Sequence, residues 1–339
     1  MIRDILVPSR LTPYDLLPFS IRLNSVQISD EYLLDFRNIG HVEPFGMLFL
    51  SALIRQFNRV RKQEQGRTFK INAINFEDKS YASWMGLFKS FGLDYGNEPG
   101  AASGSSTYIP LTRITVSRIM EKARDDFVHH GEVIEEEARK IANLLTRSDK
   151  GPITDVLSYA IREIMRNVIE HGQANCIWYA AQYWPTKNKV EVAILDEGCG
   201  LLRSLNRNKN LLIDSNEKAI FLAMQPGISG ISKDKRLRSS GEWVNSGYGL
   251  FMTSSICKIG GDFLLCSDSN AIQMSSNGVD FLPCSYKGVA IRMVIDVSKI
   301  KLLDHLLEEL RIKGEQIARS RSDFDAELTA SKMSRMLSK

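Results

Sequence analysis

The sequence lacks the features that mark zinc-binding, secreted and membrane-spanning proteins. Its five cysteines all lie after residue 175 and none forms a C-x-x-C pair, a pattern that favours reduced thiols over a zinc site. Asp4 and the prolines at positions 8, 13 and 18 do not fit a signal peptide. The longest apolar run, residues 45–54, is too short to span a bilayer. We therefore expect a cytoplasmic protein that makes no membrane contact.

No charge of one sign dominates either. The 44 Lys and Arg residues and the 40 Asp and Glu residues are interspersed, so the net charge of +4 does not indicate a nucleic-acid partner. The chain contains no G-x-x-x-x-G-K-[ST] motif, which excludes a P-loop. With 339 residues and an ordinary apolar share, it is long enough for two domains, each with its own core.

The first 95 residues alternate between strand and helix patterns. We predict a strand, a helix, a strand and a helix at residues 32–39, 44–57, 69–76 and 80–93. This order predicts a small α/β domain. The stretch GNEPGAASGSS that follows is rich in glycine and serine, and we place a linker at residues 96–110.

The order of these elements resembles a STAS domain, the fold of bacterial anti-sigma-factor antagonists, over roughly residues 20–95. The resemblance also uses VEPFG (42–46) at the turn from strand to helix. STAS antagonists carry a phosphorylatable serine two residues before this glycine, where this chain has Pro44. The resemblance therefore implies a packing or docking module rather than a phosphorylation switch.

The remainder of the chain predicts a second α/β unit. Helices are expected at residues 117–125, 131–146, 153–169, 216–224 and from 249 onward. Strands are expected at residues 108–116, 176–184, 189–196, 262–267 and 289–297. This arrangement predicts a two-layer unit at residues 111–300, with a mixed sheet covered by helices on one face. Residues 301–339 add one amphipathic segment and a polar tail.

The segment EIMRNVIEHG (163–172) carries two polar residues at the edge of an apolar helix stripe. Apolar residues recur every three or four positions from 153 to 169, and Asn167 projects into the sector that this pattern assigns to the core. An asparagine there needs polar partners to offset lost water. Glu163, one turn earlier, borders the stripe. We therefore treat both residues as candidate site residues.

Two glycine-containing motifs follow. The predicted strand 189–196 ends in DEGCG, which places the carboxylate of Asp196 beside a backbone with little side-chain bulk. SGYGLFM (246–252) leads into a helix, whose free amide groups suit an anion such as phosphate. Each motif alone also fits an ordinary turn.

Together and in this order, the three motifs resemble the GHKL ATPases, a superfamily that includes gyrase, histidine kinases and MutL. The resemblance covers about residues 111–300 and is closest to the anti-sigma-factor serine kinases. It implies that ATP and Mg²⁺ bind, that Asn167 ligates Mg²⁺, and that Glu163 orients or deprotonates the attacking group. Asp196 would bind the adenine amine. The remaining implied nucleotide-binding residues surround the adenine ring and the phosphates: Gly198, Gly200, Gly247, Gly249 and Leu250.

Two regions depart from the family pattern. The family commonly has Gly-Thr near the last strand, whereas this chain has Gly288-Val289 and so lacks the threonine hydroxyl. Residues 201–246 form a long insertion that we expect to act as a lid. Its basic cluster KDKRLR (233–238) either reaches phosphate or forms a solvated face.

Three functions remain open from the sequence. The leading hypothesis is an ATP- and Mg²⁺-binding regulator whose nucleotide state controls docking of a protein partner, with slow ATP hydrolysis or protein-serine phosphorylation. The alternatives are a non-catalytic ATP sensor, anti-sigma-like or a scaffold, and an ATP-gated dimer clamp. A clamp usually needs a transducer domain, for which the 39 residues from Lys301 are too few. A homodimer and the identity of the partner stay open.

Overall fold

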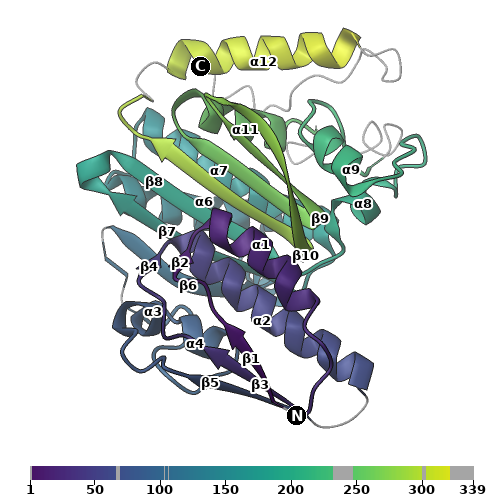
Figure 1. The fold of residues 1–339 in the computed structure, drawn as a ribbon. Coiled ribbons are helices and arrows are strands. Elements are labelled where there is room, and N and C mark those ends of the chain that lie inside the picture. The colour runs from purple at the N-terminus through teal and green to yellow at the C-terminus, as the bar shows by residue number, and fades with distance from the viewer. Residues whose placement is uncertain are drawn as a thin grey trace.

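The computed structural model describes residues 2–65, 69–102, 104–105, 107–231, 247–299 and 303–320. Over this part of the chain the protein is α/β, as the sequence predicts, with helices and strands in both halves (Figure 1). None of the described helices is long and apolar enough to cross a membrane. The basic cluster 233–238 and the tail after residue 320 lie outside the described residues.

A small parallel sheet organises the N-terminal part. Its strands pair in the order β1–β3–β5, and a two-stranded parallel pair, β2 and β4, lies beside it. The first 30 residues, for which we predicted no elements, supply β1, β2 and α1. The bounds of these elements are β1 Ile2–Leu6, β2 Arg10–Leu11, α1 Pro13–Asn24, β3 Glu31–Asp35, β4 His41–Val42, α2 Pro44–Gln65 and β5 Lys70–Ile74.

The first half of helix α2 has no polar face because it lies between two sheets. Every residue from Pro44 to Ile54 is buried, and one apolar cluster joins this segment to the small sheet and to the large sheet above it (Figure 1). A helix without a polar face must be covered all round. A side chain at Gly46 would overlap the backbone of Leu11, so the close contact of α2 with β2 requires glycine there.

The segment 80–93, which we predicted as one helix, is two short ones. Helix α3 spans Ser80–Trp84 and α4 spans Leu87–Ser90. Gly86 between them has φ of 86°, a left-handed conformation that ends a helix and that glycine adopts without strain. The periodicity of the apolar residues does not reveal this break.

The second part of the chain forms a five-stranded sheet in the order β6–β7–β8–β10–β9. Every neighbouring pair in it is antiparallel, so the prediction of a mixed sheet is wrong. Strands β9 and β10 form a long hairpin, of which the sequence predicted only the two ends. The strand bounds are β6 Tyr108–Thr115, β7 Cys176–Trp184, β8 Lys189–Asp196, β9 Asp262–Ser275 and β10 Gly278–Asp296.

Helices cover one face of this sheet as expected. Helices α6 and α7 pack against each other and against the sheet, α11 lies beside them, and α12 crosses α11 (Figure 1). The two short helices α8 and α9 precede the undescribed part of the predicted lid. The bounds are α5 Val116–Asp125, α6 His130–Thr146, α7 Pro152–Asn167, α8 Gly200–Leu205, α9 Asn216–Ala223, α11 Gly249–Gly260 and α12 Leu303–Ser320.

The opposite face of the large sheet is covered as well, by α1 and α2 from the N-terminal part (Figure 1). The prediction of helices on one face only is therefore wrong. Trp178 on β7, Leu195 on β8 and Tyr286 on β10 are buried in the same apolar cluster as Phe45 and Phe49 of α2. The N-terminal part thus shares a core with the sheet instead of forming one of its own.

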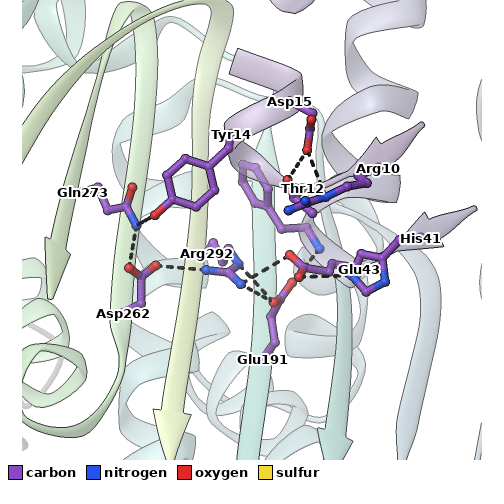
Figure 2. Close-up of polar contacts among 11 residues, drawn as sticks. Arg10, Thr12, Tyr14, Asp15, His41, Glu43, Glu191, Asp262, Gln273 and Arg292 are labelled. Atoms are coloured by element: carbon purple, nitrogen blue, oxygen red, sulfur yellow. Dashed lines mark hydrogen bonds and ion pairs between the residues drawn. The ribbon is translucent and has the colours of Figure 1, made fainter. Parts of the chain in front are cut away.

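A buried polar network lies within this shared interface (Figure 2). Arg292 on β10 forms ion pairs with Glu191 at 2.9 Å, Asp262 at 2.9 Å and Glu43 at 3.3 Å. Glu191 is fully buried, and its Oε1 accepts a hydrogen bond of 2.9 Å from the backbone N–H of Phe45 at the start of α2. A carboxylate at a helix N-terminus is electrostatically favourable. The network therefore fixes α2 on the sheet.

Candidate functional site

A cavity opens between α7, the end of β8, α8 and the start of α11. It holds about 790 Å³ of empty space, counting its open mouth. Three segments far apart in the chain, near residues 163, 196 and 249, meet at its walls. Seven of the eight site residues proposed from the sequence line it: Glu163, Asn167, Asp196, Gly200, Gly247, Gly249 and Leu250.

Asn167 is the last residue of α7 and faces the cavity. The predicted helix does not continue as an α-helix here, because a π-helical turn spans Val168–Gly172. Such turns insert an extra residue and often occur at functional sites. Asn167 is half-buried, and its side-chain amide has no hydrogen-bond partner among the residues that the structure describes. Its amide oxygen is therefore available to a ligand.

Glu163 stands one turn before Asn167 on the same wall. Its carboxylate accepts hydrogen bonds from Arg162 at 2.8 and 3.2 Å, and Arg166 lies 3.7 Å away. A side chain at Gly249 would come within 2.5 Å of Glu163 Oε2. Glycine therefore allows the start of α11 to approach this carboxylate, and the two guanidinium groups hold it in place.

Asp196 ends β8 and lies at the bottom of the cavity. Its Oδ1 accepts a hydrogen bond of 2.7 Å from the backbone N–H of Gly198. A side chain at Gly198 would overlap the carbonyl of Gly172, which accepts a hydrogen bond of 2.8 Å from Cys199 N–H. Gly198 does not line the cavity itself. Its lack of a side chain keeps the strand end and the π-helical turn in contact.

Burial sets the ionisation of Asp196. The loss of water raises the pKa of this carboxyl from 3.8 to about 7, although the backbone N–H groups of Gly198 and Val289 oppose the shift. Tyr286 donates a hydrogen bond of 2.6 Å to the backbone carbonyl of Asp196 and so fixes the strand end from the opposite face. Val289 also lines the cavity.

The remaining predicted glycines shape the cavity mouth. Gly200 has φ of 74°, and a side chain there would come within 2.5 Å of Asp268. Gly247 also has φ of 74°, and its carbonyl accepts a hydrogen bond of 3.1 Å from Gly227 N–H. Gly249 and Leu250 begin α11, so the free backbone N–H groups of a 12-residue helix are at the cavity.

Sequence reasoning missed several residues of the cavity wall. His171 and Gly172 belong to the π-helical turn, and the motif IEHG was the only signal for them. Apolar residues of α7, the π-helical turn, β8 and β10 also line the cavity. A further group comes from the predicted lid and carries no local pattern that distinguishes it. Its members are Leu201, Ser204, Leu205, Ala223, Ile228, Ser229 and Gly230.

The pKa of Asp196 predicts how stability depends on pH. Because the folded pKa of about 7 exceeds the unfolded value near 3.9, the folded state binds more protons between these pH values. In the ligand-free protein, Asp196 should therefore lower the unfolding free energy by roughly 2–4 kcal/mol as the pH rises from 4 to 8. Urea unfolding of Asp196→Asn should show a shallower pH dependence. Asp214→Asn, which removes an exposed carboxylate, should behave like the wild type. Equal slopes in all three proteins would contradict the assignment.

The side chains of the cavity suit a metal ion only if a bound ligand supplies further oxygen atoms to that ion. The described residues contain no group of three or more His, Cys, Asp or Glu side chains that could hold a metal ion. Asn167 supplies one amide oxygen at the cavity. Mg²⁺ commonly combines one or two protein oxygens with substrate phosphates. The residues therefore fit a phosphate-bound Mg²⁺ better than a free one.

No protein-family model matches the chain, and none of the curated proteins matches it. The residues of the cavity themselves indicate what it can bind. The buried carboxylate of Asp196, the side-chain amide of Asn167 and the N-terminus of α11 meet there. This combination can accept a hydrogen bond from a ring amine and contact a phosphate chain.

Proposed function

We propose that the protein is an ATP- and Mg²⁺-binding regulator of the GHKL type, whose nucleotide state controls docking of a protein partner. One observation carries the proposal. Residues from three motifs, spread from Glu163 to Leu250, line one cavity. The GHKL resemblance implies that these motifs bind the metal, the adenine and the phosphates of a single nucleotide. If the two glycine motifs were only ordinary turns, nothing would require them to lie beside the polar edge of α7.

Each residue has a role that its position supports. The Asp196 carboxylate accepts a hydrogen bond from the adenine amine at the buried end of the cavity. The N–H groups at the start of α11 contact phosphate oxygens, and Asn167 provides an oxygen for the metal. Glu163 orients the attacking hydroxyl or water and accepts its proton. Bound Mg²⁺ would supply charge neutralisation on the phosphates.

Calorimetric titration with ATP, with and without Mg²⁺, tests the proposal. Wild-type protein should bind ATP more tightly with Mg²⁺, and Asn167→Ala should lose this difference. Asn167→Asp is the matched control, because it keeps an oxygen ligand and should retain the dependence on Mg²⁺. Asp196→Asn should weaken ATP about ten- to a hundred-fold, since hydrogen bonds to charged groups are strong.

Two results would count against the proposal. If the wild type does not bind ATP, the cavity has another ligand. If Asn167→Ala binds ATP with an unchanged Mg²⁺ dependence while Asp196→Asn weakens binding, Asn167 is a structural residue and the metal has other ligands. Circular dichroism and thermal melting of each variant must show an intact fold.

A further inference from the structure

A second hollow lies between the N-terminal part and the large sheet, on the side opposite the helices that carry the first cavity. It encloses about 1380 Å³ of empty space, counting its open mouth. Its walls come from α2, α4, the segment before β6, strands β6 and β7, and the residue after β8. Six charged side chains line it: Arg55, Arg59, Lys89, Glu98, Arg113 and Glu197.

Positive charge exceeds negative charge in this hollow. Four of the six charged residues are cationic, and each of the two carboxylates already contacts at least one of these cations. Glu197 contacts Arg55 at 2.6 and 2.7 Å and Arg59 at 2.7 Å, while Glu98 contacts Lys89 at 3.1 Å. Arg113 has no carboxylate within ion-pair distance among the described residues. Three of the four cations thus have carboxylate partners, Lys89 also through Asp94 at 2.7 Å, and Arg113 adds a positive charge that a bound anion can neutralise.

The base of the hollow is aromatic. Trp178 on β7 is 5% exposed, with the Arg55 guanidinium 4.0 Å and the Arg113 guanidinium 5.7 Å from its ring centre. Stacking on the ring fixes the planar Arg55 group. Its nitrogen atoms already contact Glu197, Ser51 Oγ and the carbonyl of Ser90, so an anion reaches Arg55 only by displacing Glu197. The apolar ring also lowers the local dielectric, which strengthens attraction to a bound anion.

The chemistry of the lining selects the ligand. An apolar molecule would remove water from four cations without offering acceptors in return, which is costly. Arginine forks match the oxygen geometry of phosphate and carboxylate, and phosphate carries more charge in a small volume. The cations approach from two sides, with Arg55 and Arg59 on α2 and Arg113 on β6. A ligand with two linked anionic groups can engage both sides.

We infer that this hollow is a binding site for a compact anion carrying two or more phosphate groups, distinct from the cavity at Asp196. The two sites are joined by Glu197, which pairs with Arg55 and Arg59 and directly follows Asp196 in the chain. An anion that takes these arginines from Glu197 changes the segment that holds Asp196. This coupling, unlike the site itself, rests on the proposed function.

Titration with inorganic pyrophosphate tests the site. The wild type should bind pyrophosphate in the hollow, and Arg59→Gln and Arg113→Gln should each weaken this binding about ten- to a hundred-fold. Arg124→Gln removes an exposed positive charge from α5, away from the hollow, and is the matched control. It should bind as the wild type does. With Mg²⁺ present, Asn167→Ala should also retain pyrophosphate binding, which separates this site from the first cavity, where Asn167 is the residue proposed to hold phosphate-bound Mg²⁺.

Several results would overturn the inference. Pyrophosphate binding that is equally weak in the wild type, Arg113→Gln and Arg124→Gln would show only non-specific attraction to surface charge. Loss in Asn167→Ala with retention in Arg59→Gln would place the anion in the first cavity instead. Tight binding of a phosphoserine peptide without any binding of pyrophosphate would make the hollow a protein-docking site. Failure of the wild type to bind ATP would leave the pyrophosphate result valid and remove only the coupling.

Discussion

Replacing Glu163 by glutamine is expected to leave ATP affinity nearly unchanged and to slow phosphate release or phosphoryl transfer by about 10²–10⁴-fold. A positioned carboxylate base contributes this much to rate while adding little to ground-state binding. The structure gives Glu163 the required position, on the cavity wall beside Gly249 and held by Arg162. Glutamine keeps the shape and the hydrogen-bond acceptor but cannot take a proton.

Glu170→Gln is a suitable control for this experiment. Glu170 is also partly buried and paired with an arginine, Arg166, but it does not line the cavity. Its replacement should leave turnover close to that of the wild type. Equal turnover in the wild type and Glu163→Gln would reduce Glu163 to a structural residue. If the wild type binds ATP but releases no phosphate with any partner, the protein is a non-catalytic sensor.

Replacing Arg292 by methionine is expected to destabilise the protein by about 3–5 kcal/mol. The change leaves the buried Glu191 carboxylate without its main counter-charge, and removing one partner of a buried ion pair typically costs this much. Glu191 would still accept the hydrogen bond from Phe45. Urea unfolding at pH 7 measures the loss. The double variant Glu191→Gln/Arg292→Met should recover most of it, because the carboxylates that then lack Arg292, Glu43 and Asp262, are partly exposed to water.

The destabilisation of Arg292→Met should also depend on pH. Burial already raises the pKa of Glu191 in the wild type, and Arg292 opposes that rise. Without Arg292 the folded pKa rises further, so the variant gains stability as the pH falls and Glu191 is protonated. The difference from the wild type should therefore be larger at pH 8 than at pH 5. A difference that does not change with pH would show that lost packing, and not charge, is responsible.

The sequence predicted most elements of the second unit closely. Strands β7 and β8 have the bounds that their apolar pattern gave, because runs of β-branched and aromatic residues ended by turn residues define a strand locally. The same reasoning failed for the segment 80–93, where the left-handed conformation of Gly86 divides the predicted helix into two. It also failed for the middle of the β9–β10 hairpin, where Asp268, Ser269 and Asn270 interrupt the apolar pattern although the strands stay paired.

The sequence did not predict which elements cover the two faces of the large sheet. Residues 45–54 are an apolar run without a polar face, which showed that they are buried but not what covers them. Only the fold shows α2 between two sheets. This placement also explains why the large sheet has helices on both faces and why Arg292 and Glu191 are buried beneath α2.

By itself the sequence determined the local elements and the three motifs at Glu163, Asp196 and Gly249, because spacing along one strand or helix is a local property. Only the tertiary structure decided that these motifs share a cavity and that a π-helical turn follows Asn167. It alone also gathered cations from separate segments around Trp178. The physical reason is the same in each case. Periodicity reports which side of an element is buried, whereas its contacts depend on chain topology and on packing between residues far apart in sequence.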